Sequence, residues 1–198
     1  QSGGAFGFRD QLQDAVNLLL LDSAPAREQI GRACAHQFAA GDVCHWWHAG
    51  TGPEHGVRTR ISDDLLWLPW AVCEYVEKTG DAEILRAEYP FLAGEELEEN
   101  EHDRYQPLEP GAETGTVLEH CRRALMRVLA RGVGAHGLLL IGTGDWNDAF
   151  DRVGAQGRGE SVWLTWFFAI TARKFAALVG GHAAKQLALA ADHCTRAA

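Results

Sequence analysis

Basic residues are scarce in this sequence, since 18 Lys and Arg face 27 Asp and Glu and leave a net charge of −9. This balance disfavours nucleic acid and anionic lipid as partners. Long apolar runs are also lacking, because stretches such as "AVNLLLL" fall well short of the roughly 20 residues that cross a bilayer. We therefore expect these residues to contact neither nucleic acid nor a membrane.

Cysteine is sparse and forms no recognisable pattern. The five cysteines are odd in number and include no Cys-x-x-Cys pair, which argues against a disulfide framework and against a zinc ribbon. Free thiols indicate a reducing compartment, so we expect a cytoplasmic location. Gln1 stands where an initiator methionine would, and the final helical pattern has no stop signal. We therefore expect the sequence to be part of a longer chain.

Alternating strand patterns are almost absent, whereas helical periods recur between loops rich in Gly, Asp and Trp. The 198 residues, 46% of them hydrophobic, suffice for one domain with a core. The acidic, proline-containing residues 95–113 are expected to be a solvated linker. The pattern predicts an all-α fold of about seven helices in succession. The expected helices cover residues 10–22, 26–38, 65–78, 82–92, 117–131 and 162–180, and a last one begins near residue 182.

Chemically useful side chains concentrate in four stretches rather than along the helices. These are "GFRDQLQD" (7–14), "GDVCHWWH" (41–48), "GVRTRISDDLLW" (56–67) and "GTGDWNDAFDRVGAQGRGESVW" (142–163). If these stretches converge at one end of the helices, they form a pocket with Trp faces and fixed Arg and Asp partners. Such a pocket suits a sugar, because Trp packs on pyranose C–H faces while carboxylates and guanidinium groups bind the hydroxyls.

Several of these residues also have purely structural interpretations. Asp145 and Asp148 are spaced as turn and helix caps as well as paired acids, and one of the adjacent Trp46 and Trp47 is expected in the core. Arg60 is as consistent with an ion pair as with an anion site. A metal site is not expected, because the His-x-x-His of "HWWH" has no third ligand in register.

The motifs "GAFGFRDQLQD", "HWWH", "GVRTRISDDLLWLP", "GTGDWND" and "GESVWL" resemble, in this order, the catalytic domain of the glycoside hydrolase family 94 phosphorylases. These motifs are most similar to those of 1,2-β-oligoglucan phosphorylases and of the carboxyl-terminal domain of cyclic β-1,2-glucan synthases. The resemblance covers nearly all 198 residues. It implies that residues 1–198 form about half of an (α/α)6-barrel catalytic domain.

The resemblance further implies inverting phosphorolysis, in which phosphate attacks the anomeric carbon of a β-linked glucan, with β-1,2 as the expected linkage, and releases α-glucose 1-phosphate. Asp148 matches the general acid, and Trp146 lines the donor glucose subsite with Asp145 in support. Arg9 and Asp10 match residues that hold the donor sugar. We add Trp47, Arg60 and Asp64 as substrate-binding candidates. Phosphate is a co-substrate and no other cofactor is implied.

The resemblance places the His and Thr that hold phosphate beyond residue 198, so we expect the 198 residues alone to be inactive. It is also compatible with a homodimer of the full-length protein, and with a parent that is a membrane-bound synthase carrying this domain in the cytoplasm. Two alternatives stay open: an inverting β-glucosidase, and a non-catalytic glucan-binding domain of a larger synthase. Phosphate dependence separates the first alternative, and sugar binding without turnover would identify the second.

Overall fold

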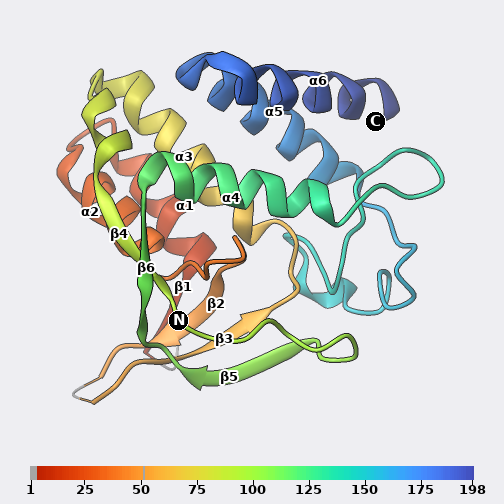
Figure 1. Cartoon of the computed structure of the whole chain (residues 1–198), viewed down its shortest axis with the longest axis horizontal. Helices are drawn as coiled ribbons and strands as arrows, with labels where there is room; N and C mark the ends of the chain where they lie inside the picture. Colours follow the sequence, from red (N-terminus) through yellow and green to blue (C-terminus); the bar gives the residue numbers. More distant parts are fainter. Residues whose placement is uncertain (1–3, 51) are drawn as a thin grey trace.

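The computed structural model describes residues 4–50 and 52–198, and within them helices and two antiparallel sheets build the fold (Figure 1). The α-helices are α1 (Phe8–Leu18), α2 (Ala24–Cys34), α3 (Asp64–Thr79), α4 (Val117–Ala130), α5 (Val162–Val179) and α6 (Gly181–Ala197). The 3-10 helices are η1 (Ala82–Arg86) and η2 (Asp148–Phe150). The strands are β1 (Ala5–Gly7), β2 (Cys44–His48), β3 (His55–Thr59), β4 (Glu88–Leu92), β5 (Asp103–Pro107) and β6 (Pro110–Thr116).

The expected all-α class, and with it the half of an (α/α)6 barrel, is wrong for this chain. The structure has 48% helix and 20% strand. One sheet has the strand order β1-β2-β3-β5, and a second pairs β4 with β6. The fold is therefore mixed, with both sheets antiparallel.

Two segments account for most of this difference. The helix expected over residues 82–92 is only the short η1 followed by β4, because Pro90 lacks a backbone N–H and disfavours a continuing helix. The linker expected over residues 95–113 contains β5 and much of β6. Both strands are rich in residues that occur rarely in strands, such as Pro, Gly, Asp and Glu. Their composition therefore does not predict the strand pairing, which depends on the rest of the fold.

The helices agree better with their sequence signals. Thr116 caps α4 by accepting a hydrogen bond from Glu119 N at 3.2 Å, and Ser161 caps α5 by accepting one from Leu164 N at 3.0 Å. Gly80 ends α3 in the left-handed region at φ 73°, which glycine adopts without steric cost. α3 lies at the centre and packs against α1, α2, α4 and α5.

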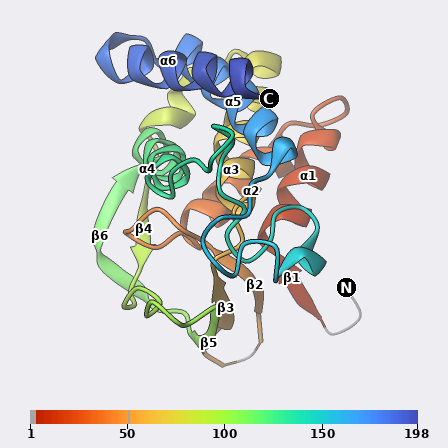
Figure 2. The same ribbon diagram turned by 90° about the vertical axis from the view of Figure 1, so that its right-hand side faces the viewer.

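The four-stranded sheet lies on one side of the molecule and the α5–α6 pair on the opposite side (Figures 1 and 2). By length and composition α5 is apolar enough to cross a membrane, the one such helix among the residues described. However, 44% of that helix is buried inside the molecule, and it packs against α3 and α6. These contacts are those of a core helix in a folded domain.

The connections of the sheet bring several segment ends together. β1 runs directly into α1, and β3 is followed by the short link that starts α3. The buried Arg58 of β3 binds Asp42 through Nε at 2.6 Å and Nη2 at 2.8 Å. This pair fixes β3 against the residues that precede β2. As a result, the starts of α1, β2 and α3 face the loop that leads to α5.

Candidate active site

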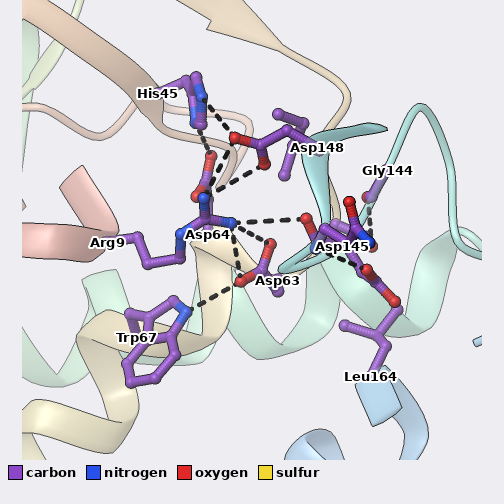
Figure 3. A network of polar contacts seen from close by, with 12 residues as sticks. Arg9, His45, Asp63, Asp64, Trp67, Gly144, Asp145, Asp148 and Leu164 are labelled. Atoms are coloured by element: carbon purple, nitrogen blue, oxygen red, sulfur yellow. Dashed lines mark hydrogen bonds and ion pairs between the residues drawn. The ribbon is translucent and has the colours of Figure 1, made fainter. Parts of the chain in front are cut away.

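Arg9, in the first turn of α1, is the centre of a polar network that joins three distant segments (Figure 3). Its Nη1 donates to both oxygens of Asp63 at 3.3 Å and to the backbone oxygen of Asp145 at 3.4 Å. Its Nη2 donates to the two oxygens of Asp148 at 3.2 and 3.3 Å. One planar guanidinium thus holds two carboxylates in fixed positions, which a lysine ammonium cannot do with the same geometry.

Asp63 immediately precedes α3 and is fully buried. Its side chain does not cap the helix but accepts a hydrogen bond from Trp67 Nε1 at 3.0 Å in addition to those from Arg9. Burial, followed by repulsion from the charge of Asp64, raises the pKa of Asp63 to about 7 despite the opposing effect of Arg9. Asp63 is therefore a buried carboxyl group that changes charge near neutral pH.

Asp64 is also buried, and it acts on the site through His45. Its Oδ2 lies 2.7 Å from Nδ1 of His45, while Nε2 of the same ring lies 4.0 Å from Oδ2 of Asp148. Burial by itself lowers the pKa of His45, but the carboxylates of Asp64 and Asp148 outweigh it and the pKa is raised. His45 thus places a second nitrogen-bearing side chain beside Asp148, in addition to Arg9.

Asp145 is buried and holds the shape of the loop that carries Asp148. Its Oδ1 accepts a hydrogen bond from Asn147 N at 2.9 Å, and its Oδ2 accepts one from Ser161 Oγ at 2.6 Å. The backbone oxygen of Gly144 accepts from both N and Oγ of Ser62 at 2.9 Å. These contacts tie the loop to the starts of α3 and α5, so the two aspartates of "GDWND" have different tasks.

Asp148 and Trp146 face outward from this support. The Asp148 side chain is 50% exposed, and Trp146 is 56% exposed. Asp10 follows Arg9 in the first turn of α1 and is also exposed. The accessible surface around the network therefore includes the carboxylates of Asp148 and Asp10 and the indole of Trp146.

The structure does not bring Arg60 and Trp47 to this cluster. Arg60 donates to the backbone oxygens of Leu97, Glu98 and Glu101 and lines a separate cavity of about 330 Å³. Trp47 is 1% exposed and stacks on His36 with ring centroids 3.9 Å apart. In this structure Arg60 thus fixes the segment before β5, and Trp47 belongs to the core.

Sequence reasoning underestimated three residues. From the sequence, Asp63 and Ser161 were not assigned to the site, and His45 was considered only as part of the His-x-x-His pair. The signal that was available is the Asp63-Asp64 doublet, because one carboxylate suffices to cap a helix. Among the side chains that the structure describes, no three His, Cys, Asp or Glu gather as a metal site, and all five cysteines are buried free thiols.

Comparison with known proteins places this network in a family context. Residues 1–195 match the profile described as the catalytic domain of the glycosyl hydrolase 94 superfamily. The chain is 52% identical over 175 residues to the cyclic beta-(1,2)-glucan synthase NdvB of Rhizobium meliloti, covering 88% of this chain and 6% of that protein. It is 33% identical over 159 residues to solabiose phosphorylase of Paenibacillus borealis, covering 80% and 17%.

A third relative is the 1,2-beta-oligoglucan phosphorylase of Listeria innocua, which is 28% identical over 177 residues, covering 88% of this chain and 15% of that protein. The chain therefore spans less than a fifth of the length of each of these relatives. These relatives are thus one synthase and two phosphorylases.

Proposed function

Because this chain belongs to the glycosyl hydrolase 94 superfamily, we propose that it contributes the acid side of an inverting β-glucan phosphorylase site, with β-1,2-linked glucose as the preferred substrate. The observation that carries this proposal is the placement of Asp148. It is a half-exposed carboxylate on a loop fixed by Asp145, and its side chain accepts hydrogen bonds from Arg9. The names of the relatives supply the class of substrate.

In the proposed reaction Asp148 donates a proton to the glycosidic oxygen as the bond to the anomeric carbon breaks. Phosphate attacks from the opposite face and forms α-glucose 1-phosphate. Phosphate is already an anion and needs no base to activate it, so one protein acid suffices. In the synthetic direction the same carboxylate removes the proton from the acceptor hydroxyl.

Arg9 connects sugar binding to the state of Asp148. In the structure its Nη2 is paired with Asp148. A sugar whose hydroxyls accept hydrogen bonds from Arg9 would separate the guanidinium from the Asp148 carboxylate. Asp148 would then take up the proton that it later donates. Arg9, Asp10 and Trp146 are the residues that we propose to contact the donor glucose. Asp63, Asp64 and Asp145 are positioning residues, since all three are buried.

The burial of these three aspartates also favours phosphorolysis over the alternative of an inverting β-glucosidase. Such a hydrolase requires a second carboxylate that activates water, about 6.5–9.5 Å from the acid. Asp63, Asp64 and Asp145 are all engaged with protein groups, so none is placed to hold a water in the open site.

The free, buried thiols support a cytoplasmic location.

The direct test is the phosphate dependence of turnover by the complete protein with a β-1,2-linked glucose oligosaccharide. We expect glucose 1-phosphate to appear, with a rate that saturates as phosphate increases and vanishes when phosphate is removed. Release of free glucose at the same rate without phosphate would establish the glucosidase instead. Oligosaccharide binding without any product would identify a non-catalytic binding domain.

A further inference from the structure

The outer face of the four-stranded sheet carries aromatic side chains that the proposed reaction does not use. In the register of the sheet, Trp46 of β2 lies opposite Val57 of β3, and Val57 lies opposite Tyr105 of β5. His48 of β2 likewise lies opposite His55 of β3. Residues that are directly opposite share one face of a sheet, so these side chains stand together.

This face points away from the core. Neighbouring residues on a strand point to opposite faces, and Trp47, the neighbour of Trp46, is the one that is buried against His36. Figures 1 and 2 show the helices on the other side of the sheet. We call Trp46, His48, His55 and Tyr105 the aromatic platform.

The four rings of the platform form a connected row. The ring centroids of Trp46 and Tyr105 are 5.9 Å apart, those of Trp46 and His48 are 5.2 Å apart, and those of His55 and Tyr105 are 5.7 Å apart. Tyr105 is 57% exposed, while Val57 beneath the row is buried. The edge strand β1 places Ala5 and Gly7 opposite His48 and Trp46 on this face, and Trp46 is half-buried.

The polar edges of the rings are available to a ligand. Among the residues that the structure describes, neither the indole N–H of Trp46 nor the hydroxyl of Tyr105 has a hydrogen-bond partner. Aromatic faces with such donors at their edges match a pyranose ring, which has apolar C–H faces and equatorial hydroxyls. A net charge of −9 disfavours a nucleic acid in the same place.

Along the chain, the platform is next to residues of the candidate active site. Trp46 directly follows His45, whose Nε2 lies 4.0 Å from Asp148. Its cross-strand partner Gly7 lies two residues before Arg9. From β2 to β5 the sheet spans two strand spacings, or about 10 Å, which is enough for more than one sugar ring.

From this placement we propose that the aromatic platform is a secondary subsite for a β-linked glucan, and that it binds glucose units remote from the bond that is broken. This inference rests on the proposed function for its ligand class. The platform contributes affinity that grows with chain length, and it takes no part in proton transfer. It would let the enzyme discriminate long chains from short ones.

The test compares chain lengths in the complete protein carrying Trp46→Ala or Tyr105→Thr. Threonine keeps the strand preference of the exposed position 105, Trp46→Phe restores an aromatic face, and Trp166→Ala removes a Trp on α5, outside the sheet. For linear β-1,2-glucan oligosaccharides we measure kcat and KM together with calorimetric binding. Loss of one aromatic contact is expected to raise KM and Kd for long chains roughly three- to tenfold.

The same variants should leave kcat and KM for the β-1,2-linked disaccharide unchanged, Trp46→Phe should recover most of the loss, and Trp166→Ala should have no effect. Equal changes for the disaccharide and the long chains, or no change for either, would overturn the platform. Binding that weakens in the variants of a protein without phosphate-dependent turnover would retain the platform and reject the proposed function. Normal phosphate-dependent turnover with unaltered long-chain binding in the variants would retain the proposed function and reject the platform.

Discussion

Replacing Ser161 by Ala should destabilise the protein more than removal of an ordinary helix cap. Ser161 Oγ accepts the hydrogen bond of Leu164 N at 3.0 Å and donates one to Asp145 Oδ2 at 2.6 Å. Loss of an N-cap costs about 1 kcal/mol. The Asp145 oxygen is then left buried without its donor, at a further cost of about 1–3 kcal/mol. The expected loss in the free energy of unfolding is about 2–4 kcal/mol.

The chain offers a matched control in Thr116, whose hydroxyl caps α4 by accepting from Glu119 N at 3.2 Å. Thr116→Ala should cost about 1 kcal/mol, and Ser161→Thr should retain most of the stability. Denaturant unfolding followed by circular dichroism gives the free energies. Only Ser161→Ala should also lower kcat, because only that change frees the loop that carries Asp148. Equal losses for Ser161→Ala and Thr116→Ala would refute the role assigned to Asp145.

Three further predictions concern charge and completeness. Asp63 has a pKa of about 7 in the folded protein and about 3.9 in the unfolded chain. Between these two pH values the folded protein keeps a proton that the unfolded chain has lost. The free energy of unfolding should therefore fall as pH rises from about 4 to about 7. Asp63→Asn should flatten this slope, by at most about 1.4 kcal/mol per pH unit, in unfolding measured across that range; an unchanged slope would reject the raised pKa. Arg9→Lys should lower kcat/KM by about 100-fold because one ammonium cannot hold both Asp63 and Asp148, and a value within twofold of wild type in steady-state kinetics would contradict this. Residues 1–198 alone should release no glucose 1-phosphate and should self-associate through the exposed Trp163, Trp166 and Ile170, so a monomer by light scattering with full activity would be the opposite result.

The helices were predictable because their signals are local. Thr116, Ser161 and Gly80 each stop or start a helix through contacts within four residues. The strands were not, because β4 and β6 are defined by pairing with each other across the intervening residues. A strand such as "PGAETGT" has little intrinsic preference for its conformation, so its extended form comes from tertiary contacts.

The candidate site shows the same division. Motif similarity pointed to Asp145, Asp148 and Arg9, which the structure brings into one network. It could not show that Arg9 binds Asp63 across 54 residues and Asp148 across 139. It also could not show which of the adjacent Trp46 and Trp47 is buried, because that depends on the register between β2 and its neighbours.

The assignment of Asp148 as the proton donor is tested most directly by varying the leaving group. Asp148→Asn in the complete protein should lower phosphorolysis of a β-1,2-linked disaccharide by about 10²–10⁴-fold, because its leaving group needs a proton. The same variant should retain much of its activity on a dinitrophenyl β-glucoside, because the dinitrophenolate leaving group departs without a proton. An equal loss on both substrates, or the leaving-group-dependent loss in Asp145→Asn instead, would contradict the assignment of Asp148.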